Sequence, residues 1–151
     1  MNKKDIKILS HLRNDARMSL TRMSKKTSIP ISTIFDKIKL LQDDVIKKHT
    51  TLLDFNKLGY STRANIMISV DRESKDPIKD YLTKNPCINS VYKINNGFDF
   101  MIEGVFRQIK DMEDFLDTLE QRFDIKDKQS YFIIDELKRE SFMTDPELVF
   151  E

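Results

Sequence analysis

The stretch that decides the fold covers residues 19–46 and reads SLTRMSKKTSIPISTIFDKIKLLQDDVI. Leu20 and Met23 lie three residues apart and Ser19 precedes them as an N-cap, so this spacing predicts a first short helix. Residues 28–30, Ser-Ile-Pro, interrupt the pattern, because proline cannot continue a helix but fits the first turn of a new one. A second helix follows, and its apolar stripe consists of Ile34, Ile38 and Leu41.

The outer face of this second helix is mostly polar. Two helices, a short break and a polar face on the second helix are the layout of a helix-turn-helix. In that motif the first helix crosses the phosphates, and the second presents side chains to base edges in the major groove. A plain pair of packed helices in an all-α core has the same spacing, so the pattern alone leaves both interpretations open. The outer-face residues are Ser32, Thr33, Phe35, Asp36, Lys37 and Lys39.

Charge separates the two interpretations. Residues 1–60 hold 13 Lys and Arg against 6 Asp and Glu, whereas residues 61–151 hold 13 against 19. The first segment is therefore net +7 and the second net −6, and a basic segment is drawn to a polyanion. Because the motif lies in the basic segment, we expect double-stranded DNA as a partner. The residues expected to contact DNA are Arg17, Ser19, Ser32, Thr33, Phe35, Asp36, Lys37, Lys39 and Lys47.

Some members of this set have alternative roles. Lys37 and Lys39 could be solvated helix charges rather than phosphate contacts, and Arg17 could be a loop charge rather than a backbone clamp. Asp36 would repel phosphate, yet its carboxylate could accept a hydrogen bond from a cytosine amino group. An acidic residue on this face predicts weaker nonspecific binding to DNA.

Composition argues against several classes of protein. The 151 residues form one domain or two small ones, and no run approaches about 18 consecutive apolar residues, so we expect no membrane span. The N-terminus lacks an apolar core long enough for a signal peptide, so the cytoplasm is the expected compartment. Cys87 is the lone cysteine, and no Cys/His cluster suggests a metal. Since no catalytic set converges on a predicted pocket, we expect neither an enzyme nor a cofactor.

The hydrophobic period divides the chain. We expect a helix-turn-helix domain over 1–50, a hinge strand or linker over 51–61, and a second domain over 62–151. Residues 45–53 are β-branched and basic, which fits a short strand or wing that returns along the DNA backbone.

Beyond residue 61 the elements follow the order strand, helix, strand, strand, helix, strand. The alternation from Thr62 to Val70 predicts the first strand, Asn96-Gly97 predicts a hairpin, and residues 129–137 are the expected last strand. This order is the split ferredoxin-like arrangement, so the fold class is α+β: a winged helix-turn-helix plus a ferredoxin-like βαββαβ domain.

Two helices cover only one face of such a sheet. The other face is predicted to carry residues that are too apolar to leave in water, so we expect a partner subunit to cover it in a homodimer. These residues are Met67, Met101, Val105, Phe132 and Ile134. The tail is also apolar around Asp145-Pro146, at Phe142, Met143, Leu148, Val149 and Phe150, and it either packs on a partner subunit or frays.

Several short motifs together resemble one family. They are Asp5-x-x-Ile8-Leu9-x-x-Leu12, Asp15-Ala16-Arg17, Ser32-Thr33-Ile34-x-x-Lys37-Ile38-x-x-Leu41, Val45-Ile46-Lys47, Leu53-Asp54-x-x-Lys57-Leu58-Gly59-Tyr60, Val91-Tyr92-x-Ile94 and Phe98-Asp99-Phe100. On these residues the chain resembles the Lrp/AsnC family, the feast/famine regulators, nearly from end to end. The resemblance implies a winged DNA-binding domain and a ligand-sensing sheet domain of the RAM or ACT-like type. It also implies dimers, often assembled into tetramers or octamers, that bind amino acids and regulate transcription.

The chain departs from the family pattern at four places, one of which is formed by Leu40 and Asp36, where a basic residue is common; this departure suggests an altered target sequence. Pro30 stands where serine usually caps the recognition helix, so Ser32 is expected to cap a slightly shorter helix, and Asp44 replaces a usual glycine. At the effector loop the family pattern is glycine-aspartate-aromatic-aspartate, whereas residues 96–99 here read Asn-Gly-Phe-Asp. The residues expected to contact an effector are Asn96, Gly97 and Asp99, although the alternative role of Asp99, a polar residue at the end of the hairpin, is slightly favoured.

The altered loop leaves two functions open. One is a transcription regulator modulated by an amino acid or a related small molecule. The other is an effector-independent architectural protein or constitutive repressor whose sheet domain only oligomerises. With one loop acid absent, we expect common amino acids to bind weakly or not at all, because one charged hydrogen bond contributes about 1.5–3 kcal/mol.

Overall fold

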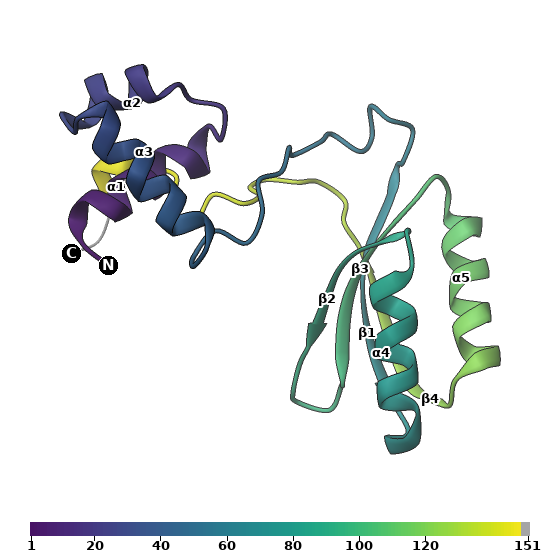
Figure 1. The fold of residues 1–151 in the computed structure, drawn as a ribbon. Coiled ribbons are helices and arrows are strands. Elements are labelled where there is room, and N and C mark those ends of the chain that lie inside the picture. Colours follow the sequence, from purple (N-terminus) through teal and green to yellow (C-terminus); the bar gives the residue numbers. More distant parts are fainter. Residues whose placement is uncertain (149–151) are drawn as a thin grey trace. The chain divides into compact units, whose positions relative to one another are not determined.

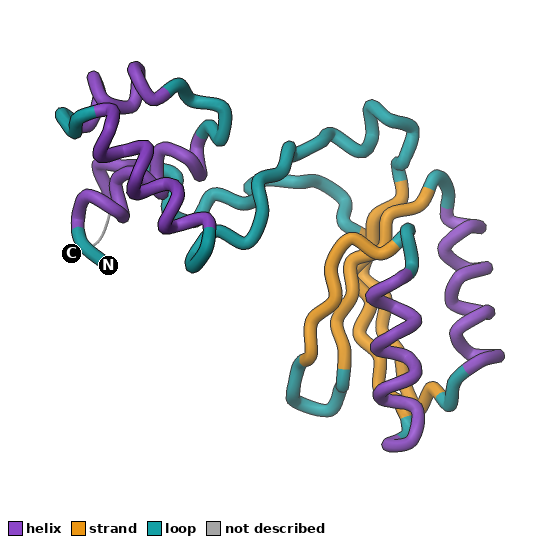
Figure 2. The backbone as a smooth tube through the Cα atoms, in the orientation of Figure 1, coloured by secondary structure: helices purple, strands orange, loops and turns teal. Residues whose placement is uncertain are grey.

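The computed structural model describes residues 1–148, and Val149 and Phe150 of the predicted apolar tail lie outside the described residues. The chain forms two compact units, drawn in Figures 1 and 2. The first unit contains residues 1–52 together with the tail from Leu137, and the second contains Leu53–Glu136. The sequence placed 62–151 in one domain, and the structure differs because the tail packs within the N-terminal unit.

The N-terminal unit contains three helices: α1 (Lys3–Asn14), α2 (Leu20–Thr27) and α3 (Ile31–Gln42). Each helix buries the apolar stripe that its spacing predicts. The largest fully buried side chains are Ile8 of α1, Met23 of α2 and Ile34 of α3. They form one core with Leu9, Met18, Ile29 and Leu41.

A tight turn joins α2 to α3. Ser28 adopts the left-handed conformation at φ 57°, which ends α2. The next residue, Ile29, is buried in the core, and its carbonyl accepts a hydrogen bond from the Ser24 hydroxyl at 2.6 Å. Pro30 is the N-cap of α3. Ser32 therefore lies inside the first turn rather than at the cap, and the expectation of a shorter helix capped by Ser32 is wrong.

No strand forms at residues 45–53, where the sequence predicts a short strand or wing. Residues 46–54 have no regular secondary structure, and the described sheet contains only β2, β3, β1 and β4. A single extended segment gains no ladder hydrogen bonds without a partner strand, so β-branched composition alone does not produce a strand here.

The second unit confirms the βαββαβ order. A turn at residues 55–59, closed by Gly59 at φ 88°, precedes the first strand. The sheet is antiparallel with the order β2-β3-β1-β4, and Figure 1 shows α4 and α5 on one side of it. The elements are β1 (Thr62–Val70), a 3-10 turn (Arg72–Ser74), α4 (Lys75–Lys84), β2 (Ile88–Lys93), β3 (Phe100–Phe106), α5 (Ile109–Arg122) and β4 (Ile125–Phe132).

Alternate residues of the two central strands form the core of this unit. Ile66 and Ile68 of β1 and Ile102 of β3 are fully buried on the side of the helices. Ile78 of α4 and Leu119 of α5 pack against them. None of the helices in residues 1–148 combines the length and the apolar character that crossing a bilayer requires.

The last strand begins and ends earlier than the sequence predicts. It covers Ile125–Phe132 instead of residues 129–137, and its register pairs Ala64 with Phe132 and Ile68 with Lys128. Its first half is rich in lysine and aspartate and shows no apolar alternation. Such polar residues are typical of an edge strand, which needs protection against further pairing.

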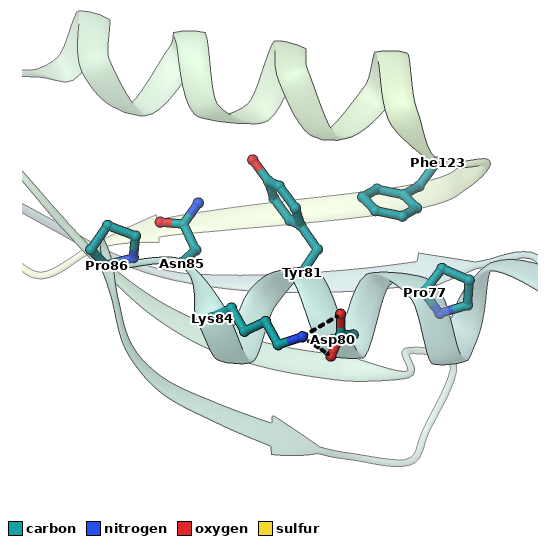
Figure 3. A pocket seen from close by; sticks show the side chains of 7 residues that line it. All are labelled: Pro77, Asp80, Tyr81, Lys84, Asn85, Pro86 and Phe123. Atoms are coloured by element: carbon teal, nitrogen blue, oxygen red, sulfur yellow. Dashed lines mark hydrogen bonds and ion pairs between the residues drawn. The ribbon is translucent and has the colours of Figure 1, made fainter.

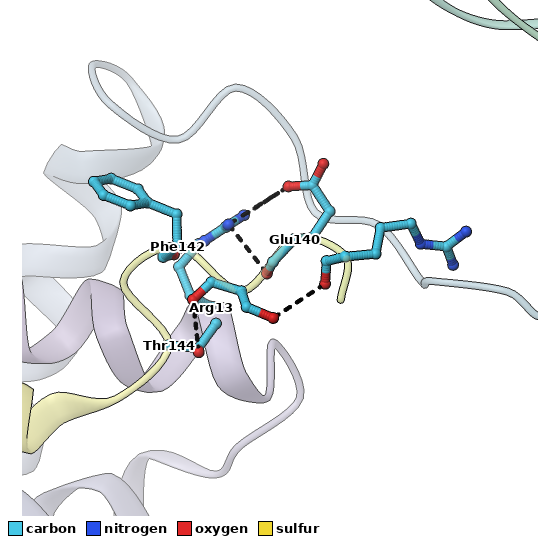
Figure 4. Close-up of polar contacts among 6 residues, drawn as sticks. Arg13, Glu140, Phe142 and Thr144 are labelled. Carbon is cyan, nitrogen blue, oxygen red and sulfur yellow. Dashed lines mark hydrogen bonds and ion pairs between the residues drawn. The ribbon is translucent and has the colours of Figure 1, made fainter. Parts of the chain in front are cut away.

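The tail packs on α1 of the same chain. The sequence alone allows two other outcomes, packing on a partner subunit or fraying. Arg13 is the anchor: its Nε donates to the carbonyl of Phe142 at 2.9 Å, and its Nη2 donates to the carbonyl of Glu140 at 3.2 Å (Figure 4). The Glu140 carboxylate lies 3.4 Å from Arg13 Nη1. A 3-10 turn at Pro146–Leu148 follows. The chain therefore returns to the N-terminal unit after β4.

Candidate functional site

The exposed face of α3 is a narrow stripe. Ser32, Phe35, Asp36 and Lys39 are all exposed, and their spacing of three and four residues places them on one face. The buried Ile34 lies on the opposite side of the helix. Four of the residues expected to contact DNA therefore share a surface that a groove can reach, which we call the α3 stripe.

Lys37 lies outside the α3 stripe. Its Nζ donates to Asp5 Oδ1 at 2.7 Å, and both side chains are largely buried. Asp5 also belongs to the capping box of α1, in which its backbone N–H donates to Asn2 Oδ1 at 2.9 Å. The hydrogen bond from Lys37, followed by the one from the Asn2 backbone, lowers the pKa of Asp5. Lys37 thus links α3 to α1, which makes it a positioning residue rather than a free phosphate contact.

The remaining predicted DNA contacts have separate positions. The Ser19 hydroxyl accepts from the Arg22 backbone N–H at 3.1 Å, so Ser19 is the N-cap of α2 as its spacing predicts. Thr33 is half-buried on the flank of α3. Arg17 and Lys47 are exposed, Arg17 between α1 and α2 and Lys47 in the irregular segment after α3.

A basic face on α2 was missing from the predicted set. Arg22, Lys25 and Lys26 are exposed and lie three and four residues apart, on the side away from the buried Met23. In a helix-turn-helix the first helix crosses the backbone, so these cations occupy the place where phosphates are expected. Their helical spacing was the available signal, but the prediction concentrated on the second helix.

The predicted effector loop is the turn between β2 and β3. Asn96 and Gly97 both have positive φ, at 68° and 94°, which agrees with the hairpin signal. Both residues are exposed, and a Cβ added at Gly97 would meet no atom within 4 Å.

Asp99 does not point out of this loop, because its carboxylate binds groups of the same unit. Oδ2 accepts from the Val70 backbone N–H at 2.9 Å, and Oδ1 lies 3.2 Å from Lys75 Nζ. The hydrogen bond from Val70 is the main cause that lowers the pKa of Asp99, and Lys75 lowers it further. Asp99 therefore fastens the hairpin to the end of β1 and the start of α4. The expectation that it is the loop carboxylate available to an ammonium group disagrees with this geometry.

We predict that Asp99→Ala lowers the free energy of unfolding by about 2 kcal/mol at pH 7, because a partly buried, charge-assisted hydrogen bond is lost. Folding lowers the pKa of Asp99, so this contribution is present above the unfolded pKa of about 3.9 and disappears as pH falls through the lower folded pKa. Urea unfolding at several pH values measures it. The exposed Asp117→Ala is the matched control, and an equal effect of both substitutions would contradict this role of Asp99.

The sheet face opposite the helices is only partly the one that the sequence predicts. Met67 and Met101 are paired at its centre, with Tyr92 beside Met101, and Val105 shares this face as predicted. Phe132 lies on the helix side, because it pairs with the buried Ala64. Tyr131 takes its place on the open face, since it pairs with Asn65. Ile134 follows the end of β4 and is 98% exposed, so the predicted positions of Phe132 and Ile134 are wrong.

An ion-pair cluster borders this open face. Arg63 Nη2 lies 3.3 Å from the Glu103 carboxylate, and Arg63 Nη1 lies 2.7 Å from that of Glu136. Glu103 also accepts from the Asn89 side-chain amide at 2.7 Å. The guanidinium of Arg63 lies 5.3 Å from the ring centroid of Phe55. The open face therefore combines an apolar centre with a paired, polar border.

One pocket, of about 530 Å³, lies beside α4 and contains none of the predicted site residues (Figure 3). Tyr81 and Phe123 form its aromatic side, with ring centroids 5.5 Å apart. Asp80 and Lys84 pair with each other at 2.9 Å, so they offer no unpaired charge to a ligand. Pro77, Asn85 and Pro86 complete the lining. Across residues 1–148, no group of three or more His, Cys, Asp or Glu side chains is arranged to hold a metal ion.

Comparison with known proteins agrees with both units. The family model of the Lrp/AsnC ligand binding domain matches residues 63–142, and that of a winged helix-turn-helix DNA-binding domain matches residues 1–44. An uncharacterized helix-turn-helix transcriptional regulator of Pyrococcus furiosus is 30% identical over 143 residues, covering 94% of this chain and 96% of the relative. The glutamate uptake regulatory protein of Zymomonas mobilis is 28% identical and covers 95% of this chain and 90% of its own length.

Solved structures share the fold. A transcriptional regulator of Neisseria meningitidis in complex with L-Met superposes with a TM-score of 0.86 at 23% identity, covering 92% of this chain and 93% of the other. LrpC of Bacillus subtilis gives a TM-score of 0.83 at 20% identity, with 91% and 97% covered. The chain therefore belongs to the Lrp/AsnC family of transcription regulators, with a helix-turn-helix DNA-binding unit followed by a ferredoxin-like ligand-binding domain.

Proposed function

We propose that the chain regulates transcription by placing the first half of α3 in the DNA major groove. The observation that carries this proposal is the α3 stripe, which is exposed within the segment of net charge +7. In this arrangement Lys39 contacts phosphate, and Arg22, Lys25 and Lys26 of α2 contact the neighbouring backbone. Asp36 accepts a hydrogen bond from a cytosine amino group. The relative from Pyrococcus furiosus is a helix-turn-helix transcriptional regulator, which supports a role other than catalysis.

The proposed assembly is a homodimer through the open sheet face. Met67, Met101 and Val105 are half-buried within the chain and gain cover from a second copy, while the exposed Tyr92 and Tyr131 add aromatic area. A twofold dimer presents two α3 helices, so the operator is a pseudo-palindrome whose half-site centres lie about one helical turn or a multiple apart. Tetramers or octamers of such dimers extend the same arrangement.

The proposed response to amino acids is weak. The L-Met complex of the Neisseria structure makes an amino acid the first ligand class to consider. Asp99, however, is occupied by Val70 and Lys75, and Gly97 stands at the position of the usual first loop acid. An ammonium group would therefore find no unpaired carboxylate among residues 96–99. The same observation favours the second candidate function, an effector-independent architectural protein or constitutive repressor that uses the sheet domain only to oligomerise.

Selection of bound duplexes from a random pool by the full chain, with and without a mixture of the twenty amino acids, tests the proposal. We expect enrichment of one pseudo-palindromic site and the same enrichment in both arms. Absence of any enriched sequence would contradict sequence-specific binding. Enrichment that depends on the mixture, together with a micromolar dissociation constant by calorimetry that Asp99→Ala abolishes, would contradict the weak amino-acid response.

A further inference from the structure

The recognition helix exposes large apolar side chains. Ile31 is 46% exposed, Phe35 is 56% exposed and Leu40 is 71% exposed, although α3 has 12 residues and buries a separate apolar stripe through Ile34. Single apolar residues are common on protein surfaces. Phe35, however, lies within the α3 stripe that is proposed to face the groove, so its ring is placed to contact a base. Phe35 belongs neither to the buried core of this unit nor to the partly buried residues packed against that core.

Position along the helix separates these residues. Ile31 and Phe35 lie four residues apart in the first half of α3, so their side chains form one apolar ridge beside Ser32. The N-terminal residues of a recognition helix are the ones that contact base edges. Leu40 lies in the second half and on the other flank of the stripe, so it does not belong to this ridge.

The major groove offers one apolar group, the 5-methyl group of thymine. We propose that Phe35, supported by Ile31, contacts a thymine methyl group in each half-site and thereby determines specificity for thymine at that position. This inference rests on the proposed function and extends it, because it names the base that the apolar ridge reads. Asp36, on the other side of Ser32, reads a neighbouring amino group, so the ridge and the carboxylate distinguish different base pairs.

Charge favours DNA over a protein partner for this ridge. The exposed cation Lys39 lies one turn from Phe35, and Arg22, Lys25 and Lys26 are exposed on the adjacent α2. An apolar protein interface is depleted of lysine at its core, whereas a base contact is flanked by cations that bind phosphate. The exposed cations around the ridge therefore favour contact with a base over contact with a protein.

The test uses duplexes that carry the sequence enriched by the random-pool selection, in which each thymine is replaced in turn by uracil. Uracil keeps the hydrogen-bonding groups of thymine and lacks only the methyl group. For the unmodified chain, we expect uracil at one position in each half-site to weaken binding about fourfold. This factor corresponds to the burial of one methyl group, which contributes about 0.8 kcal/mol. For Phe35→Ala, we expect about tenfold weaker binding to the thymine site and no further loss with uracil. Because Phe35 is exposed and alanine favours helices, this variant keeps the fold.

Leu40→Ala is the matched control, since it removes an exposed apolar side chain from the same helix. It should retain the fourfold uracil penalty. The inference is overturned if no uracil position weakens binding, or if Phe35→Ala keeps the same penalty. It is also overturned if Phe35→Ala changes the oligomeric state instead of the base preference. If the unmodified chain enriches no sequence at all, both this inference and the proposed function fail, whereas enrichment without methyl dependence overturns only the inference.

Discussion

Replacing Met67 with aspartate is expected to convert the proposed dimer into monomers and to weaken operator binding by at least a hundredfold. Met67 pairs with Met101 at the centre of the open sheet face, so a twofold dimer would bring two new carboxylates into an apolar centre. An unpaired buried carboxylate costs several kcal/mol, and each subunit contributes one. A monomer holds only one half-site, so it loses most of the affinity that two linked recognition helices provide.

Light scattering at micromolar concentration measures the mass, and a gel-shift titration measures the affinity. The half-buried position of Met67 within the single chain means that the monomer remains folded, which circular dichroism checks. Met67→Leu is the matched control, because it keeps the volume and adds no charge, and it should remain a dimer. A Met67→Asp protein that stays dimeric would show that another surface holds the subunits together.

The second prediction is that Lys39 and Lys37, two lysines of α3, have different roles. Lys39→Ala should weaken DNA binding about tenfold and reduce the slope of log affinity against log salt by about 0.9 for each lost phosphate contact. Lys37→Ala should leave that slope unchanged, because Lys37 Nζ is already bound to Asp5. It should instead lower the free energy of unfolding by about 1 kcal/mol, since Asp5 loses its partner.

Titrations at four salt concentrations, combined with urea unfolding of both variants, measure the two effects. Asp5→Asn serves as the control for the structural role, because it should reproduce the instability of Lys37→Ala without changing the salt slope. If Lys37→Ala flattened the salt dependence as much as Lys39→Ala, the ion pair seen here would not persist in the DNA complex.

The helical parts of the fold could be predicted from the sequence because their signals are local. The spacing of Ile34 and Leu41 predicts the buried side of α3, and Asn96-Gly97 predicts the β2–β3 turn. The last strand was misplaced because its lysine-rich first half, Ile125–Lys128, owes its conformation to pairing with β1, which no local pattern reports. The face of Phe132 was wrong for the same reason, since a shift in register changes the face.

The sites were harder to predict than the fold. Of the six residues expected on the outer face of α3, Ser32, Phe35, Asp36 and Lys39 are exposed, whereas Thr33 and Lys37 are half-buried. Spacing leaves open whether Lys37 contacts phosphate and whether Asp99 contacts an effector or ends the hairpin, because the partner of each, Asp5 and Val70 respectively, lies far away in the sequence. Helical spacing and turn signals predict which polar residues lie on an exposed face or in a turn. Only the tertiary structure shows which of these polar groups are already bound to distant residues.

The central claim is that the first half of α3 lies against DNA, and site-directed cleavage tests it most directly. An iron chelate attached to Ser32→Cys, in a Cys87→Ser background that removes the exposed native thiol, generates radicals that cut DNA near residue 32. We predict two clusters of cuts, one in each half-site and about one helical turn or a multiple apart, and none for the Cys87→Ser protein treated in the same way. Cuts spread over the whole duplex, or none above that background while the protein remains bound, would contradict the account.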